Sequence, residues 1–214
     1  MLIRIFALLI TCCLAVPCVV FAELNTDLRI KLGSAAGVEQ VDATNIGLGQ
    51  IDTNPRSSGN FQIDLAISQK QEAGAFFVGS LGLFGRSHSG HYGALPTDIK
   101  YDAGGISGAA GVGVKASENI HFEGKLEIGI GSGKPTLTTP GFIWNTVNEG
   151  IYSSASLIVG GYYTVAKPGL QIGLELGTQS FIGNFQIWNN AGYWVDSNVK
   201  GSGGIANLVF GYQF

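Results

Sequence analysis

Alternation of apolar and polar side chains with a period of two recurs along most of this chain, and it requires extended strands. The clearest example is the segment 170–177, in which Leu, Ile, Leu and Leu alternate with Gln, Gly, Glu and Gly. Similar segments lie at 27–32, 61–68, 106–116, 120–130 and 207–214, and two less regular ones at 75–85 and 150–165. These eight segments predict an all-β fold.

Two of the eight segments are less clearly sorted into faces than the others. In the third, three apolar residues in a row at 76–78 leave open which side chains share a face. In the sixth, we expect the apolar face to carry Leu157, Val159, Tyr163 and Val165.

The connections between these segments alternate in length. Long connections at 34–60, 86–105, 132–149 and 186–203 follow the odd-numbered segments, and short ones at 69–74, 117–119 and 166–169 follow the even-numbered segments. Transmembrane barrels have this asymmetry, with short turns at one end and longer loops at the other. All five prolines beyond residue 22 are expected in connections, because a proline cannot donate to a strand ladder: Pro55, Pro96, Pro135, Pro140 and Pro168.

The distribution of charge decides between a soluble and a membrane-spanning β fold. A soluble sandwich or lipocalin-like barrel also alternates, but it buries its large apolar side chains and exposes its charges. Here the charges share one face with many glycines, and the opposite face carries almost none over lengths that can cross a bilayer. The sequence therefore predicts an eight-stranded antiparallel up-and-down transmembrane β-barrel with charges inside.

The predicted interior face holds charges of both signs in nearly equal number, which a crowded lumen requires because an unpaired buried charge is costly. His121 shares this face with Glu123 and is expected to belong to the same network. The interior polar network is predicted to consist of Arg29, Lys31, Asp64, Lys115, His121, Glu123, Lys125, Glu127 and Glu175.

Aromatic side chains gather near the expected strand ends, where rings favour the boundary between membrane and water. They are Phe61, Phe142, Trp144, Phe185, Trp188, Tyr193 and Trp194. Downstream of residue 22, no continuous apolar stretch reaches the 18 residues that a spanning helix needs.

Residues 1–22 have the features of a secretory signal peptide. Arg4 precedes an apolar run that ends in Val20-Phe21-Ala22, which predicts cleavage before Glu23. A membrane anchor fits less well because Pro17 interrupts the run, and the residues before the cysteines are poor for lipoprotein processing. All three cysteines would leave with this peptide, so the mature chain 23–214 is expected to fold without disulfides.

The last residues of the chain resemble the C-terminal signal of Gram-negative outer-membrane proteins, which the barrel-assembly machinery recognises. Leu208, Phe210, Tyr212 and Phe214 alternate with other residues, and the final one is aromatic. The mature chain as a whole resembles the small eight-stranded barrels of the OmpA transmembrane domain and the OmpX/Ail type. This resemblance implies periplasmic termini, long connections outside the cell, and contact with outer-membrane lipid and lipopolysaccharide.

Few motifs for chemistry are found. His88 and His91 form an H-x-x-H pair without an evident third metal ligand, and we expect both to be solvated loop residues. The stretch 186–192 lacks the histidine and serine of a lipid-A deacylase, and 129–135 resembles a phosphate loop only superficially. We therefore expect no catalytic site, metal or cofactor.

The net charge of −3, with no basic stripe, gives no footprint for nucleic acid. The function predicted from the sequence is that of a non-enzymatic outer-membrane barrel with a plugged interior. Its four long loops would support envelope integrity or adhesion to an extracellular ligand. Two alternatives remain open, a lipid-A-modifying enzyme and a small-solute channel.

Overall fold

The computed structural model describes residues 24–44, 49–69, 74–94, 97–138, 147–165, 169–188 and 192–214. Nearly all of them are in strands: β1 (Leu24–Ala35), β2 (Gln40–Ala43), β3 (Gly49–Asp52), β4 (Asn54–Gln69), β5 (Ala75–Tyr92), β6 (Thr97–Lys115), β7 (Ile120–Thr138), β8 (Val147–Asn148), β9 (Gly150–Thr164), β10 (Gly169–Trp188) and β11 (Trp194–Gln213). Within these ranges, no helix has the length and apolar character needed to cross a membrane. The expected signal peptide, 1–22, lies outside the described residues.

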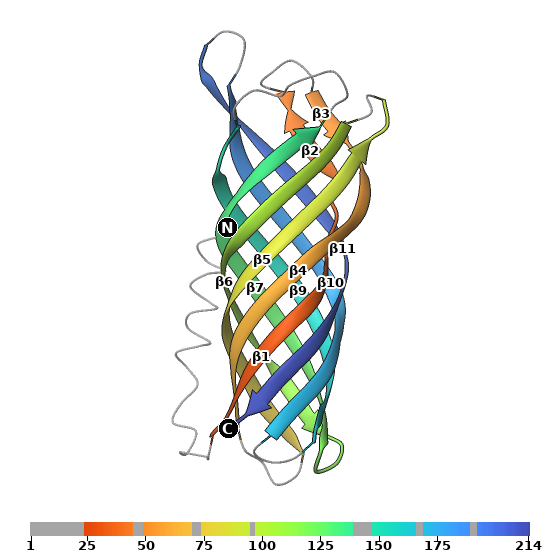
Figure 1. The fold of residues 1–214 in the computed structure, drawn as a ribbon, viewed down its shortest axis with the longest axis vertical. Helices are drawn as coiled ribbons and strands as arrows, with labels where there is room; N and C mark the ends of the chain where they lie inside the picture. The colour runs from red at the N-terminus through yellow and green to blue at the C-terminus, as the bar shows by residue number, and fades with distance from the viewer. Residues whose placement is uncertain are drawn as a thin grey trace.

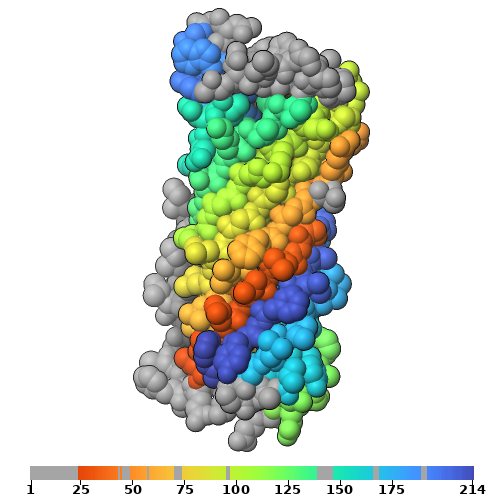
Figure 2. All heavy atoms as spheres, in the orientation of Figure 1, coloured from red at the N-terminus to blue at the C-terminus, as the bar shows by residue number. Residues whose placement is uncertain are grey.

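Eight long antiparallel strands form a closed ring in the order β1, β4, β5, β6, β7, β9, β10, β11. The seam between β11 and β1 closes through pairs such as Leu32 with Leu208 and Leu28 with Tyr212. The prediction of an eight-stranded antiparallel barrel is confirmed. The strands run at a steep tilt, and the C-terminus and the β2–β3 hairpin lie at opposite ends (Figure 1). Figure 2 shows neighbouring strands packed side by side as a continuous wall on this face.

The outer surface of one half of the barrel is apolar. Large hydrophobic side chains lie exposed there on all eight long strands, for example Leu81 at 74 % and Leu157 at 62 %. The facing of the third predicted segment is now clear, because Phe77, Leu81 and Leu83 are exposed and Val78 is buried. The prediction for the sixth is confirmed, since Leu157, Val159, Tyr163 and Val165 are all exposed. An apolar surface of this size marks contact with a membrane or another protein, and a band that runs around a closed barrel is typical of a bilayer-spanning one.

The outer surface of the other half is polar. Charged side chains on the outer face, including Arg56, Lys100, Asp102, Lys134 and Lys200, lie toward the end opposite the C-terminus. β10 has 20 residues, so at about 3.3 Å per residue it is about 66 Å long. With a tilt of about 40° it rises about 50 Å, roughly twice the height of the ~25 Å apolar band of an outer-membrane barrel. About half of the wall therefore projects beyond the membrane.

The four long loops expected from the sequence are much shorter in the structure. Much of 34–60, 86–105, 132–149 and 186–203 belongs to strands, with β5 continuing to Tyr92 and β6 starting at Thr97. The outer wall of the projecting half is in contact with solvent. Its outward positions therefore carry glycine, serine and charged residues, and not the apolar residues of the membrane half. The apolar alternation that marks a lipid-facing strand is consequently lost.

Two prolines were wrongly placed in connections. Pro55 lies in β4 before its pairing with β1, which begins at Ser58. Pro135 lies in β7 beyond Gly133, where pairing with β9 ends. Each proline therefore occupies a stretch with one partner strand, where a missing N–H group is tolerated. Pro96, Pro140 and Pro168 fall outside the described residues.

The aromatic residues near strand ends divide into two groups. Phe61 is exposed near the middle of the wall, as expected for an interfacial role. Trp188 and Tyr193 are also exposed, but they lie at the tip of the β10–β11 hairpin in the projecting half, so the interfacial role expected for them was wrong. Phe185 was wrongly assigned to this role, because it lies on the inward register of β10 and is only 2 % exposed. A further set of exposed rings surrounds the end near the C-terminus: Phe77, Phe122, Tyr163, Tyr212 and Phe214. Phe142 and Trp144 lie outside the described residues.

Candidate functional site

The lumen of the membrane-embedded half is filled by charged side chains. Nine are almost fully buried, four cations and five carboxylates: Arg29, Lys31, Arg86, Lys125, Asp27, Asp64, Glu123, Glu127 and Glu175. Inward positions of a barrel alternate with lipid-facing ones, so each strand can deliver a charge to the lumen without exposing it to lipid. Charges of both signs stabilise one another only if each finds a partner there.

At the end near the C-terminus, Arg29 is the centre of the network. Its Nη1 and Nη2 donate to Oε2 and Oε1 of Glu123 at 2.8 and 2.7 Å, and Nη2 also donates to Asp27 Oδ2 at 2.8 Å. The guanidinium lies over the ring of Tyr162, 4.5 Å from its centroid. Such two-pronged contacts suit the planar fork of arginine.

Two lysines connect this end to the middle of the lumen. Lys31 Nζ lies 2.7 Å from Asp64 Oδ2 and 3.3 Å from Glu175 Oε2. Lys125 Nζ donates to Glu175 Oε1 and to the Tyr162 hydroxyl, each at 2.7 Å. The carboxylate of Glu175 thus joins both lysines.

Arg86 forms the upper boundary of the charged layer. It donates to Glu127 Oε1 at 2.5 Å and to Ser154 Oγ at 2.7 Å. Gln62 accepts from Arg86 at 3.2 Å and donates to Glu127 at 2.8 Å. Arginine and carboxylate are therefore both held in place by neutral side chains.

Eight of the nine residues expected in the network come together in the lumen, with His121 half-buried at its edge and 3.2 Å from Glu123. Lys115 does not join them: it lies partly exposed at the end of β6, and no ion pair to it occurs within the described residues. Arg86 was missed because it was assigned to a loop. Arg86 lies two residues after the buried Phe84 on β5, and this period of two is the signal that could have predicted its inward position.

Above the charged layer, the lumen is filled by aromatic and aliphatic side chains. They are Ala36, Val38, Val41, Phe84, Ile99, Tyr101, Ala103, Tyr152, Phe181, Phe185, Ile187 and Val199. We call these residues the upper core. It lies within the projecting half of the barrel, so this half has an apolar interior and a polar exterior, the reverse of the membrane half.

His88 lies inside the upper core, and the expectation of a solvated loop histidine was wrong. The side chain is fully buried, stacks on Phe181 at 3.7 Å between centroids, and contacts the Tyr152 hydroxyl through Nε2 at 3.0 Å. Its Nδ1 lies 2.7 Å from the carbonyl oxygen of Ala36. Since His91 lies on the opposite face of β5, the two histidines cannot share a metal ion.

The segment between β1 and β2 contributes two side chains to the upper core. Ala36 and Val38 are buried, at 1 % and 0 % exposure. The Val38 amide donates to the Ser89 carbonyl at 2.9 Å, and the Ala36 amide donates to Gln179 Oε1 at 3.2 Å. These bonds satisfy backbone groups that leave the β1 ladder.

Tyr101 is fixed in the upper core by two glycines. A Cβ atom at Gly133 would lie 2.5 Å from the Tyr101 ring, and one at Gly183 would lie 2.3 Å from it. Only glycine allows the ring to lie flat against both strands.

The remaining polar contacts give no catalytic arrangement in the part of the chain that the structure describes. His91 Nδ1 lies 2.7 Å from Asp98 Oδ1 outside the membrane, and this contact, assisted by Arg56, lowers the pKa of Asp98. None of the three histidines makes a hydrogen bond to a serine hydroxyl in these ranges. No group of three residues suited to hold a metal ion occurs in them.

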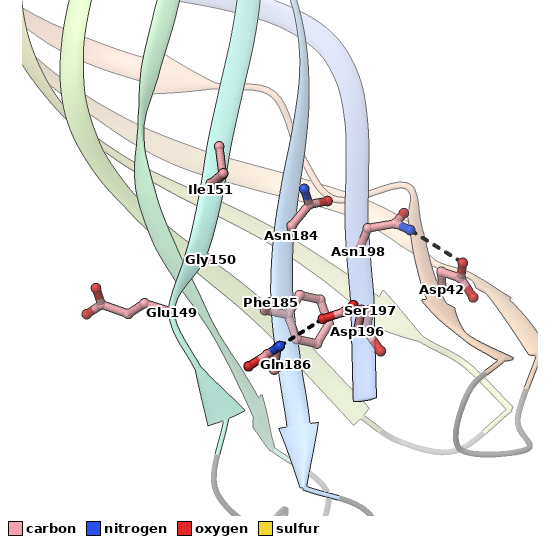
Figure 3. A pocket seen from close by; sticks show the side chains of 10 residues that line it. All are labelled: Asp42, Glu149, Gly150, Ile151, Asn184, Phe185, Gln186, Asp196, Ser197 and Asn198. Atoms are coloured by element: carbon pink, nitrogen blue, oxygen red, sulfur yellow. Dashed lines mark hydrogen bonds between the residues drawn. The ribbon is translucent and has the colours of Figure 1, made fainter. Parts of the chain in front are cut away.

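A hollow of about 630 Å³ lies on the outer face near the projecting end. It is lined by Asp42, Glu149, Gly150, Ile151, Asn184, Phe185, Gln186, Asp196, Ser197 and Asn198, and we call it the rim hollow. Gln186 donates to Asp196 at 2.9 Å and Asn198 donates to Asp42 at 3.4 Å, while Glu149 extends away on the β9 side (Figure 3). The Asp42 carboxylate accepts hydrogen bonds from Thr44, and these lower its pKa.

A closed ring of eight strands, an apolar outer band and a lumen packed with paired charges define a small β-barrel membrane protein of the outer-membrane class. No protein-family model matches the chain, and no curated protein matches it.

Among solved structures, the chain is similar to Ail of Yersinia pestis in complex with the heparin analogue sucrose octasulfate (14 % identity, 90 % of this chain and 99 % of that chain, TM-score 0.42). It is also similar to OprG of Pseudomonas aeruginosa (12 %, 89 % and 95 %, TM-score 0.45) and to Neisserial surface protein A (14 %, 89 % and 97 %, TM-score 0.37). At these identities and TM-scores, the likeness says nothing about what the present chain binds.

Proposed function

We propose that this chain is a non-conducting outer-membrane barrel whose projecting half presents a rigid surface for interactions outside the cell. The filling of the lumen at two levels is the observation that carries this proposal. Ions would have to pass the Arg29 and Arg86 clusters and then the upper core, where Tyr101, Tyr152 and Val38 are fully buried. Eight strands enclose a space that side chains can fill completely.

The polar exterior of the projecting half supports the second part of the proposal. Interactions here would be made by strand surfaces held by a packed core, instead of by the long loops expected from the sequence. A preordered surface loses less conformational entropy on binding than a flexible loop does. Envelope integrity or adhesion fits such a surface better than transport does.

The location proposed for this chain also involves its two ends. Residues 1–22 would direct export, leaving 23–214 as the barrel. Leu208, Phe210, Tyr212 and Phe214 all lie exposed on the lipid-facing side of the closing strand, where an assembly machinery could recognise them. Lipid and lipopolysaccharide would surround the apolar band.

Single-channel recording in planar bilayers tests the proposal. The folded protein, verified by its heat-dependent shift on a gel, is added to bilayers that respond to an open porin in a parallel experiment. We expect no unitary current from this chain at any voltage tested. Reproducible current steps from the folded protein would overturn the non-conducting barrel and favour a small-solute channel.

A further inference from the structure

We propose that the tip of the β10–β11 hairpin inserts aromatic rings into the surface of a second, apposed lipid bilayer. Three residues carry this inference, Trp188, Tyr193 and Trp194, and we call them the aromatic tip. The inference rests on the proposed function, because the tip must face the outside of the cell. It follows from the kind of side chain at the tip, the uncharged sequence around it and the rigid support beneath it.

The aromatic tip lies far from the membrane that holds the barrel. Trp188 ends β10, and it pairs with Trp194 at the start of β11. Since β10 rises about 50 Å, this pair lies about 25 Å beyond the apolar band. The described part of the hairpin also reaches further from the C-terminus than the β2–β3 hairpin does (Figure 1). An opposing surface would therefore meet the aromatic tip before it meets the β2–β3 hairpin.

The side chains of the aromatic tip are of the kind that lies at the boundary between membrane and water. Trp188 is 42 % exposed and Tyr193 is 58 % exposed. The indole rings of Trp188 and Trp194 meet edge to face, with 5.2 Å between centroids. Tryptophan and tyrosine combine an apolar ring with a polar N–H or O–H group, so they favour a site that is apolar at one end and wet at the other. The bilayer around the barrel cannot provide that site at this height.

The sequence around the aromatic tip carries no charge. Residues 187–195 read Ile-Trp-Asn-Asn-Ala-Gly-Tyr-Trp-Val. This stretch can enter a headgroup layer without the cost of removing an ion from water. It also has no lysine or arginine to attract anionic lipid, so the zwitterionic surface of phosphatidylcholine is the partner that it fits.

A polar row below the aromatic tip sets the depth of insertion. Gln186 donates to Asp196 at 2.9 Å, and these two residues pair across the hairpin. Their row lies two residues below the tryptophan pair, which corresponds to about 6.8 Å of strand. Amphipathic segments at a bilayer surface are buried by about 5 to 10 Å. The tip can therefore reach the headgroup level before the Asp196 carboxylate would have to enter.

The aromatic tip has a rigid support. Ile187 and Val195, the neighbours of the two tryptophans, turn inward: Ile187 belongs to the upper core and Val195 packs against it. On its other edge, β10 pairs with β8 through Gln186 and Ile187. A preordered tip loses less conformational entropy when its rings are buried than a flexible loop would.

The test is flotation with lipid vesicles. The folded full-length barrel is held in nanodiscs and mixed with phosphatidylcholine vesicles whose acyl chains carry bromine near the carbonyl end. A Trp144→Phe background leaves Trp188 and Trp194 as the only tryptophans. We expect the barrel to float with the vesicles, empty nanodiscs to stay behind, and bromine to quench the tryptophan fluorescence. Phosphatidylserine vesicles should bind no better.

Variants connect the binding to the aromatic tip. Trp188→Ser should weaken vesicle binding about tenfold, because burial of an aromatic ring supplies at least that factor. Asn184→Ala is the matched control, since it lies on β10 below the Gln186–Asp196 row and should leave binding unchanged. Asp196→Asn should increase the quenching, because it removes the charge that limits the depth. Each variant is first shown to be folded by its heat-dependent gel shift.

Several outcomes would overturn the inference. Failure to float with phosphatidylcholine vesicles would do so, as would equal flotation of the parent protein and folded Trp188→Ser. Flotation only with vesicles that contain a glycolipid would show that the tip binds sugar, and flotation only with phosphatidylserine would show that charge drives the binding. Either result excludes insertion into a zwitterionic surface.

The two proposals fail in different ways. If planar bilayers stay silent and the vesicles do not bind, the aromatic tip is wrong and the non-conducting barrel stands. If the protein conducts but floats with phosphatidylcholine vesicles in a manner that depends on Trp188, the aromatic tip stands and the non-conducting barrel is wrong.

Discussion

Replacing Arg29 by methionine should destabilise the barrel strongly, because two buried carboxylates lose their arginine partner. Asp27 has no other ion pair among the described residues, whereas Glu123 keeps Lys125 at 3.1 Å. The buried charges change from four cations and five carboxylates to three and five. Removing one partner of a buried pair typically costs about 3 to 5 kcal/mol, and we expect a loss in this range.

The assay is equilibrium urea unfolding of the barrel refolded in phospholipid vesicles, followed by tryptophan fluorescence and the heat-dependent gel shift. Lys100→Met is the matched control, because Lys100 and Asp102 form an ion pair at 3.0 Å with both side chains at least half exposed. Exposed pairs contribute less than about 1 kcal/mol. The triple variant Arg29→Met/Asp27→Asn/Glu123→Gln leaves three cations and three carboxylates buried and should recover most of the loss.

Equal losses for Arg29→Met and Lys100→Met would refute the reasoning, since they would mean that water or lipid head groups screen the lumen. A triple variant that is less stable than Arg29→Met alone would refute the charge balance in particular.

Three further predictions concern other parts of the barrel. Gly183→Ala should lower the free energy of unfolding by about 1 to 3 kcal/mol, because the new Cβ would meet the ring of Tyr101. In the same unfolding assay, the double variant Gly183→Ala/Tyr101→Ala should lose less stability than the two single variants lose together. The contact with His91 lowers the pKa of Asp98. The stabilisation that this contact gives is therefore present above the ordinary carboxyl pKa and is lost as the pH falls through the lowered pKa of Asp98. His91→Ala should raise the Asp98 pKa measured by NMR, and an unchanged value would exclude the contact. Phe214→Ala should reduce the amount of barrel assembled in cells and leave refolding in detergent unchanged, as compared on heat-shift gels.

The membrane half could be predicted from the sequence because hydrocarbon imposes a strict rule on every second residue. Segments such as 170–177 and 207–214 therefore show their facing directly, and the inward charges follow by elimination. The limits of these strands could not be predicted, since the same strands continue into a different solvent.

The projecting half was missed because its alternation has the opposite sense. In residues 97–103, Ile99, Tyr101 and Ala103 point inward, and charged residues alternate with them on the outside. This pattern is as regular as those of the membrane half, but it was assigned to a connection. His88 and Arg86 were misplaced for the same reason.

The rim hollow depends on register, which single segments do not encode. From the sequence, Asn184 is expected at the end of a strand, and Asn198 is expected inside the connection 186–203. Only the pairing of β10 with β11 brings them opposite each other. The partner of Gln186 is likewise set by this pairing.

The reversal of polarity partway up the wall fixes how deep the barrel lies in the bilayer. If the barrel moved deeper into the bilayer, exterior charges such as Lys134 and Asp102 would enter hydrocarbon. Placing a cation near the midplane costs about 2 to 4 kcal/mol. If the barrel moved outward, apolar side chains such as Leu174 would be transferred from lipid to water. Both displacements are opposed on all strands at once, so the wall itself holds the height of the outer rim above the membrane constant.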